Sequence, residues 1–371
     1  MRIAVQASDL DHTRIDGTRV YLFELLKRFG EINTKDLFTL YHKTVFNSLL
    51  TPPSFENYQA LPLPFPKAWM QTRFAWEMFR VKPDKLFLPI QAAPALFPRS
   101  IEVTATIHDL AFKRYPETFP WRDRLKLNFM LSTVVRQADK LIAVSESTKQ
   151  DLLEFFPHIP ESKIRVIHHG FNKEFFGKRL SGNELHQKLA PYQLQANGYF
   201  LYVGALQPRK NLVRLMQAFA QVKTSCPEAK LVLAGEAAWL ADEIHAQQRQ
   251  SQFREDIVLT GRVDFETLRA LYQGAKVFTF PSLYEGFGIP ILEAFASRVP
   301  VITANNSSLP EVAGDGAFYC DAVNTDDIAL ALKTVWHDHA LRDTLIAKGQ
   351  ERLAYFSWDK CAKETMEFIL A

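Results

Sequence analysis

The residues best suited to chemistry in this sequence lie in one short stretch, residues 281–293 (PSLYEGFGIPILE). An apolar strand pattern ends there, a turn with two glycines follows, and a helical pattern begins at Ile289. Glycine lets a backbone approach a ligand closely, and the free amides of a helix N terminus attract anions. The stretch therefore predicts an anion site, framed by the carboxylates of Glu285 and Glu293.

Two simpler explanations compete with that hypothesis. A glutamate in the first turn of a helix often only complements the helix dipole, and this explanation stays open for Glu293. A dinucleotide site is disfavoured, because Ile291 stands where the third glycine of a G-x-G-x-x-G pattern belongs.

A pair of cations, Arg209 and Lys210, follows the strand pattern of residues 199–205. In an open parallel sheet, ligands bind outside the carboxyl ends of the strands, and the turn at 286–289 also follows such an end. Alone, two cations in a loop are usually only solvated. Beside the glycine turn, they are placed to neutralise a bound diphosphate.

Apolar runs alternate with helical patterns along the whole chain, which favours α/β architecture with mostly parallel sheets. The breaker-rich residues 177–198 separate two such series, so we expect two doubly wound domains. The expected strands cover residues 2–6, 103–108, 140–145, 164–168, 199–205, 230–235, 256–262, 276–282 and 300–304. The expected helices cover residues 18–29, 211–225, 265–274 and 289–297, with a further helix opened by a capping box from Ser308 to Glu311.

Composition excludes several other classes of protein. With 371 residues, 47% of them hydrophobic, and a net charge of +3, the chain is neither disordered nor a typical nucleic-acid binder. Three scattered cysteines argue against a disulfide framework and suit a reducing compartment. No apolar run is long enough for a transmembrane helix or a signal peptide, so we expect a cytoplasmic protein.

Several motifs together resemble a known family. The stretch PSLYEGFGIPILEA, with two glutamates separated by seven residues, is similar to the hallmark of retaining glycosyltransferases of family four. Further similar stretches, in the same order as in the family, are TIHDLAFKRYPETF, ADKLIAVSESTKQDL, KIRVIHHGFN, VGALQPRKNL and the region 259–282.

The resemblance implies the GT-B fold, in which two Rossmann-like domains face each other across a cleft. We expect residues 1–185 to form the acceptor-side domain and residues 186–355 the nucleotide-sugar domain. Residues 356–371 would form a terminal helix that returns to the first domain.

The resemblance also implies roles for individual residues. In catalysis it implicates a first-domain histidine, one glutamate and the basic pair: His108, Glu285, Arg209 and Lys210. In donor binding it implicates both glutamates, the basic pair and backbone at the strand ends: Gly17, Arg209, Lys210, Arg262, Val263, Glu285, Gly286, Phe287, Gly288, Ile289 and Glu293. Glu293 would bind the ribose, Glu285 the hexose hydroxyls, and Arg262-Val263 would lie beside the base.

Two positions depart from the family pattern. Arg19 replaces the second glycine near the start of the first helix, where it would supply a cation in place of a close backbone approach. Ala205 stands where some relatives have an arginine, which leaves more of the leaving-group charge to Arg209.

Metal ligation is not expected. Asp9-Leu-Asp11 has the D-x-D spacing of a metal site, but short Asp residues are also ordinary in loops. His168 and His169 are adjacent, so local geometry points them apart. We therefore expect no metal and no cofactor.

The expected activity is transfer of a hexose from a nucleotide diphosphosugar, with retention, to a saccharide or lipid-linked saccharide. Similarity to mannosyltransferases of surface-polysaccharide assembly favours GDP-mannose as donor, with UDP-glucose-type donors next. The alternatives are a catalytically silent sugar-nucleotide-binding subunit and a GT-B phosphorylase or epimerase.

One segment predicts contact with a membrane. Residues 65–136 contain twice as many Lys and Arg as Asp and Glu, interleaved with Trp and Phe. Cations and aromatic rings together suit an anionic lipid surface, although a merely solvated basic face is the simpler alternative. The hypothesis adds peripheral attachment at the inner face of the plasma membrane, and no nucleic-acid partner.

Overall fold

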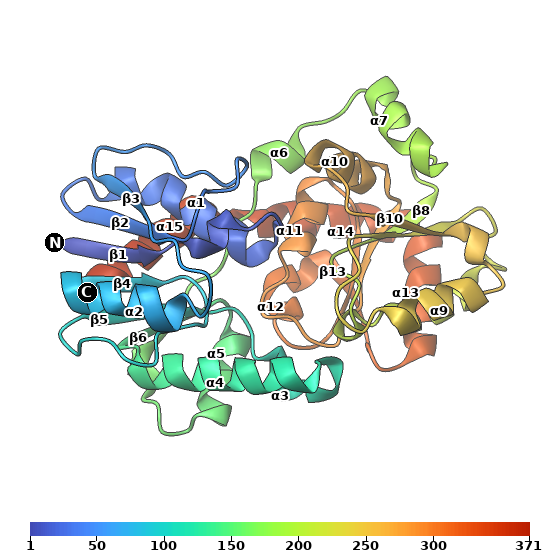
Figure 1. The fold of residues 1–371 in the computed structure, drawn as a ribbon. Helices are drawn as coiled ribbons and strands as arrows, with labels where there is room; N and C mark the ends of the chain where they lie inside the picture. The colour runs from blue at the N-terminus through green and yellow to red at the C-terminus, as the bar shows by residue number, and fades with distance from the viewer. The chain divides into compact units, whose positions relative to one another are not determined.

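A computed structural model describes residues 1–371, and the chain divides into two compact units (Figure 1). The first unit comprises Met1–Lys113, Arg122–Gly170 and Ser357–Ala371. The second unit comprises Arg114–Trp121 and Phe171–Phe356. Each unit has its own parallel sheet, which confirms the expected pair of doubly wound domains.

The sheet of the first unit has seven parallel strands in the order β3-β2-β1-β4-β5-β6-β7. The central strands are almost wholly buried, as expected for a parallel sheet with helices on both faces. The strands are β1 (Arg2–Gln6), β2 (Leu37–His42), β3 (Tyr58–Pro62), β4 (Lys85–Leu88), β5 (Glu102–Ile107), β6 (Lys140–Ala143) and β7 (Ile164–Val166).

Helices pack against this sheet. They are α1 (Gly17–Ile32), α2 (Ala75–Val81), α3 (Ala111–Arg114), α4 (Trp121–Gln137), α5 (Glu146–Phe155) and the terminal helix α15 (Trp358–Leu370). Helices α2 and α4 also expose large apolar side chains. Short 3-10 or π turns lie at Ser8–Asp11, Met70–Phe74, Pro116–Thr118 and Glu161–Lys163.

The terminal helix α15 packs on α1 within the first unit. Arg28 of α1 donates a hydrogen bond from Nε to Asp359 over 2.5 Å. Gly170 makes the close approach possible, because a Cβ there would lie 2.1 Å from the backbone nitrogen of Trp358. The expected return of the last helix to the first domain is therefore observed.

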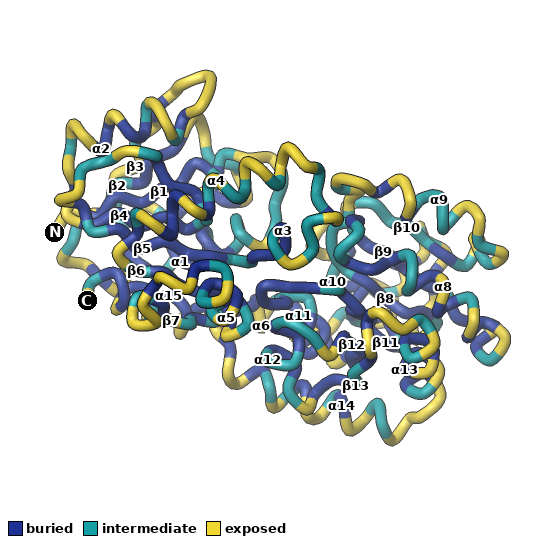
Figure 2. Tube along the Cα trace, turned by 90° about the horizontal axis from the view of Figure 1, so that it is seen from below, coloured by how far each residue is buried: buried dark blue, intermediate teal, exposed yellow.

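The sheet of the second unit has six parallel strands in the order β10-β9-β8-β11-β12-β13. Most residues of its strands are buried (Figure 2), and many of them are aliphatic or aromatic. They are β8 (Tyr199–Val203), β9 (Lys230–Ala234), β10 (Ile257–Gly261), β11 (Val277–Phe280), β12 (Val301–Ala304) and β13 (Ala317–Cys320).

Helices cover both faces of this sheet. They are α6 (Lys173–Gly177), α7 (Gly182–Leu189), α8 (Leu212–Val222), α9 (Asp242–Gln250), α10 (Phe265–Gly274), α11 (Ile289–Ala296), α12 (Leu309–Ala313), α13 (Thr325–His337) and α14 (His339–Arg352). Turns of 3-10 helix lie at Ala190–Tyr192, Pro208–Lys210, Arg254–Asp256, Gly314–Gly316 and Leu353–Tyr355. Asp264 caps α10 as expected, accepting a 2.7 Å hydrogen bond from the amide of Thr267.

The segment 177–198 is more ordered than its breaker-rich sequence indicates. Ser181 and Glu184 form a capping box that starts α7, because each side chain accepts from the backbone amide of the other residue. The expected domain boundary at residue 185 falls inside this helix. The contacts place the division between Gly170 and Phe171.

No helix of the chain combines the length and the apolar character needed to cross a bilayer.

Candidate functional site

In the second unit the strand order reverses between the neighbouring strands β8 and β11. From β8, the chain first builds β9 and β10 on one side and then β11 to β13 on the other. The loop after β8 leads toward β9 on one side of the sheet, and the loop after β11 leads toward β12 on the other side. Because β8 and β11 are neighbouring parallel strands, both loops begin close together. Ligands of open α/β sheets bind at such a switch point.

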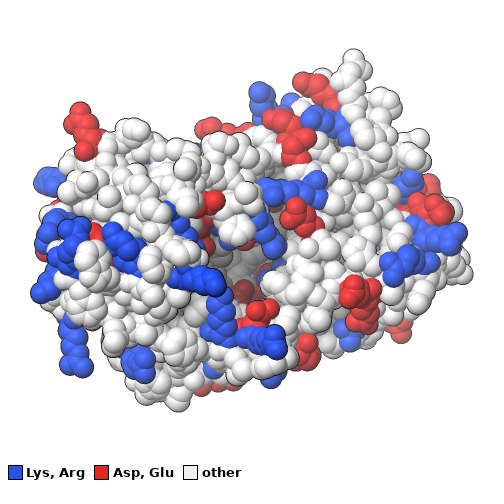
Figure 3. Space-filling model, in the orientation of Figure 1, with Lys and Arg blue, Asp and Glu red and all other residues white.

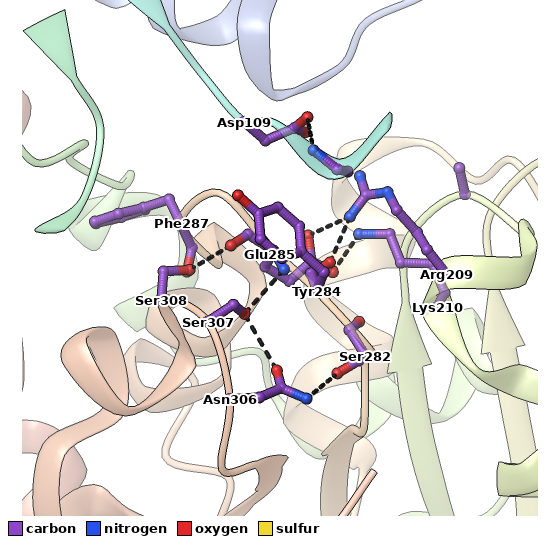
Figure 4. Close-up of polar contacts among 12 residues, drawn as sticks. Asp109, Arg209, Lys210, Ser282, Tyr284, Glu285, Phe287, Asn306, Ser307 and Ser308 are labelled. Carbon is purple, nitrogen blue, oxygen red and sulfur yellow. Dashed lines mark hydrogen bonds and ion pairs between the residues drawn. The ribbon is translucent and has the colours of Figure 1, made fainter. Parts of the chain in front are cut away.

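Three charged side chains meet at this switch point (Figure 4). Lys210 donates from Nζ to one carboxylate oxygen of Glu285, and Arg209 donates from Nη1 to the other over 2.9 Å. Arg209 also donates from Nη1 to the carbonyl of Tyr284 over 2.8 Å. Glu285 is 6% exposed and Lys210 is 7% exposed, so this ion cluster is largely removed from water.

Local structure places the two cations. Residues Pro208–Lys210 form a 3-10 turn directly after β8, and Asn211 ends it with a left-handed φ of 63°. The side chain of Asn211 donates from Nδ2 to the carbonyl of Pro281 over 3.0 Å and to that of Ala322 over 2.6 Å. Because Asn211 links the loop after β8 to the end of β11, the basic pair is held against Glu285.

The cluster keeps Glu285 ionised. Burial alone would raise its pKa, but the nearby charges of Lys210 and Arg209 outweigh burial and lower the pKa of Glu285 to about 2. The site therefore contains a fixed carboxylate at neutral pH.

The glycine turn has the geometry that the sequence predicts. Gly288 adopts a φ of 121°, a conformation that side chains rarely allow, and α11 begins at the next residue, Ile289. Pro290 occupies the first turn of α11, where a missing amide costs nothing. The turn over Gly286, Phe287 and Gly288 leads into this helix N terminus, whose unsatisfied amides attract anions.

The loop after β12 holds this turn in place, a role that the sequence does not predict. Ser308 donates from Oγ to the carbonyls of Glu285 (3.0 Å) and Phe287 (2.6 Å), and the hydroxyl of Ser307 accepts from the amide of Glu285 over 3.0 Å. Asn306 adds a 3.2 Å hydrogen bond to the carbonyl of Ser282.

The capping box expected from Ser308 to Glu311 is therefore wrong. Ser308 has helical backbone angles and makes no side-chain cap to α12. Its hydroxyl instead bonds the neighbouring loop, because the carbonyls of Glu285 and Phe287 lie within its reach.

Glu293 lies in a different electrostatic environment from Glu285. Its Oε2 accepts a 2.8 Å hydrogen bond from the hydroxyl of Tyr272 on α10. The residue as a whole is partly exposed, but its carboxyl lies deep among protein atoms, and this burial raises its pKa to about 7. The two glutamates of the motif therefore differ in charge near neutral pH.

Arg262 and Val263 lie at the carboxyl end of β10, on the same edge of the sheet as the ion cluster. The guanidinium of Arg262 is 3.9 Å from the carboxylate of Glu236, and both side chains are nearly half exposed. The structure thus brings every expected donor-binding residue of the second unit to one sheet edge.

In the first unit, His108 follows β5 and has a fixed ring. Its Nε2 donates to the carbonyl of Pro89 over 2.7 Å, and its backbone amide donates to Gln91 over 3.1 Å. The ring of Tyr21 meets His108 edge-on at 5.1 Å, and the ring centre of His169 lies 5.4 Å away. Burial lowers the pKa of His108, which favours a neutral imidazole.

Gly17 begins α1, where the amide of Arg19 donates to the N-cap Asp16. Arg19, the cation that the sequence places near the start of this helix, pairs its guanidinium with Asp16. Its Nε also donates to the carbonyl of Asp9 over 3.2 Å. The positive charge there is already offset.

The two aspartates of the D-x-D pattern have structural hydrogen bonds. Asp11 accepts from the backbone amides of Lys43 (2.7 Å) and Thr44 (2.9 Å), and its other oxygen lies 3.1 Å from Nδ1 of His42. Asp9 accepts from Gln6 over 3.1 Å. Both side chains therefore stabilise the loop conformation through hydrogen bonds within the protein.

The comparisons with known proteins agree with this geometry. Two family models match the chain: Glycosyltransferase Family 4 over residues 17–175, and Glycosyl transferases group 1 over residues 190–352. The fold and the site define a GT-B glycosyltransferase. The chain belongs to the group 1 glycosyltransferases of family four.

Three similar proteins illustrate the range of the family. The O-antigen chain mannosyltransferase B of Escherichia coli is 32% identical over 264 residues, covering 70% of this chain and 68% of that protein. The glycogen synthase of Mycobacterium tuberculosis is 28% identical over 283 residues, covering 73% and 63%. HepE of Anabaena, solved in complex with UDP and glucose, has a TM-score of 0.78 at 17% identity, covering 100% and 99%.

We expect Ser308→Ala to destabilise the second unit, because it removes the buried hydroxyl that donates to the carbonyls of Glu285 and Phe287. Losing a buried hydrogen-bond partner costs about 1–3 kcal/mol. Urea unfolding followed by circular dichroism measures the change. Ser132→Ala on the exposed side of α4 is the matched control and should change little. Equal stability of the two variants would show that the Ser308 bonds do not hold the turn.

We expect Glu293 to make the protein less stable as pH rises from about 4.5 to about 7. In that window the folded chain keeps a proton on Glu293 that the unfolded chain has released, so the free energy of unfolding falls with increasing pH. Relative to Glu293→Gln, the wild type should lose about 1–3 kcal/mol across this window. Urea unfolding at both ends of the window tests it; a constant difference between the two proteins contradicts the raised pKa.

Proposed function

We propose that this protein transfers a hexose, with mannose favoured, from a nucleotide diphosphosugar to a saccharide or lipid-linked saccharide, with retention. The observation that carries the proposal is the buried cluster of Lys210, Arg209 and Glu285 beside the N terminus of α11. It places cations, backbone amides and one fixed carboxylate together at the switch point of a parallel sheet.

The cations and the helix N terminus are suited to a leaving diphosphate. Negative charge on that group grows as the glycosidic bond breaks, and fixed donors in a site removed from water stabilise such charge most effectively. Arg209, Lys210 and the amides at Gly288 and Ile289 supply these donors. The proposed reaction therefore requires no metal ion or cofactor.

In this proposal the remaining groups each bind a different part of the donor. Glu293 accepts hydrogen bonds from ribose hydroxyls, Glu285 from hexose hydroxyls, and the backbone at Arg262-Val263 lies beside the base. Both carboxylates stand on one loop–helix segment, so they do not form the opposed pair of a glycosidase. A same-face reaction, in which the leaving phosphate helps to deprotonate the acceptor, is the mechanism we propose. The neutral imidazole of His108 would hydrogen-bond the transferred sugar.

Relatives support two donor classes. The name of the Escherichia coli relative, an O-antigen chain mannosyltransferase, supports GDP-mannose. The glycogen synthase and the UDP-glucose complex of HepE keep UDP-hexoses as the second candidate. The intact ion cluster favours an active transferase over a silent sugar-nucleotide-binding subunit.

Lys210→Ala should lower turnover about a hundredfold or more and weaken donor binding far less, because the growing charge needs its cation chiefly in the transition state. Initial rates with GDP-mannose and UDP-glucose, together with calorimetric donor affinities, separate the two effects. Lys223→Ala removes another buried lysine of the same unit and is the control. Loss of donor affinity without loss of turnover contradicts the role, and absence of transfer by the wild type contradicts the proposed function.

The proposal includes reversible attachment to an anionic membrane, where a lipid-linked acceptor would lie. The face of the first unit in Figure 3 carries many Lys and Arg side chains. Arg73 and Arg80, on or beside α2, both pair with the fully buried Glu77, so a carboxylate offsets part of the positive charge of this segment. The segment 65–136 is thus not a uniform docking face.

Helix α4 is the best-suited element. Trp121, Leu125 and Phe129 recur every four residues, so they share one side of the helix, and each is about 60% exposed. Lys126 and Arg136 are exposed on the same helix. Aromatic and cationic side chains together favour the headgroup region of an anionic bilayer.

A variant carrying Leu125→Ser, Phe129→Ser, Lys126→Glu and Arg136→Glu should lose binding to anionic vesicles, since each cation contributes about 1 kcal/mol at such a surface. Flotation with phosphatidylglycerol vesicles at low salt measures the bound fraction. A control variant, Val323→Ser with Leu330→Ser, removes exposed apolar side chains of the second unit. If the wild type stays unbound, the basic face is only solvated and a soluble saccharide becomes the favoured acceptor.

A further inference from the structure

The cations that the proposed reaction assigns to the diphosphate already hold a carboxylate. Lys210 pairs with one oxygen of Glu285, and Arg209 lies 2.9 Å from the other. All three side chains are largely buried. Their charges therefore interact more strongly than they would in water. A diphosphate that reaches these cations therefore meets a fixed negative charge as well.

The carboxylate of Glu285 is held in place from several sides. Its backbone amide is bound by the hydroxyl of Ser307, and its carbonyl accepts from Ser308. Arg209 reinforces the position by bonding the carbonyl of Tyr284 in addition to the carboxylate. The lowered pKa of Glu285 means that the group does not escape repulsion by taking up a proton at neutral pH.

The strength of this repulsion depends on the state of the diphosphate. A free nucleoside diphosphate ends in a phosphate monoester, which gains a second negative charge with a pKa near about 6. In a nucleotide diphosphosugar the same phosphate is esterified and cannot gain that charge. Near neutral pH, a fixed carboxylate therefore disfavours the free nucleoside diphosphate more than its ester.

We propose that Glu285 is a specificity-determining residue that acts through its charge: it selects the esterified diphosphate of the donor over the free diphosphate product. After transfer, the product regains its terminal charge, and the carboxylate competes with it for Lys210 and Arg209. Glu285 thereby promotes product release, besides any contact with the sugar. This inference rests on the proposed donor class.

Calorimetry with UDP, GDP and their β-methyl esters tests the proposal, because a methyl group adds no sugar contact. The wild type should bind the methyl ester of its preferred nucleotide about tenfold more tightly than the free diphosphate near pH 8. In Glu285→Gln the free diphosphate should bind more tightly than in the wild type, and the preference for the ester should disappear. Product inhibition by the free diphosphate should become stronger in the same variant.

Glu266→Gln is the matched control, because Glu266 forms an ion pair with Arg269 on α10, outside the ion cluster. It should keep the wild-type preference for the ester. Equal affinity of the wild type for the ester and the free diphosphate overturns the proposal, and this comparison needs no variant. A Glu285→Gln variant that keeps the full preference also overturns it. If the wild type binds no nucleotide diphosphate and no diphosphosugar, both the role of Glu285 and the proposed function fail. If it binds them with equal affinity for ester and free diphosphate, only the role of Glu285 fails.

Discussion

The ion cluster of Lys210, Arg209 and Glu285 is the interaction on which the functional edge of the second unit depends. Charges buried away from water are costly unless they are paired, and here three of them are brought together by loops that follow different strands. Neither loop provides a complete site alone. The parallel sheet and its reversal between β8 and β11 bring the cations and the carboxylate within hydrogen-bonding distance.

The two glutamates of the loop–helix segment show how position tunes equivalent side chains. Glu285 faces two cations and stays ionised, whereas Glu293 faces the hydroxyl of Tyr272 and gains a proton near neutral pH. The first therefore contributes a permanent charge, and the second a group whose charge changes with its surroundings. This difference arises from neighbours contributed by the loop after β8 and by α10, not from the motif itself.

The turn between these glutamates is supported from outside. Ser308 could have capped α12, but its hydroxyl bonds the carbonyls of Glu285 and Phe287. Asn211 similarly joins the loop after β8 to the end of β11. Short polar side chains from the loops after β8 and β12 thus stabilise the backbone of this turn. Such support is needed because a glycine-containing turn has little rigidity of its own.

The sequence alone determined the α/β class, the two parallel sheets, the positions of most strands and of some helices, and the charged residues and glycine turn of the candidate site. Those properties depend on local patterns: apolar runs for buried strands, caps and prolines for helix starts, and glycines at the turn before α11. The tertiary structure decided which charged groups meet. In the folded chain Arg19 pairs with Asp16, Arg73 pairs with Glu77, and Ser308 donates hydrogen bonds to the loop before α11. Partner choice among polar groups depends on distances across the fold, which the spacing of residues along the chain does not encode.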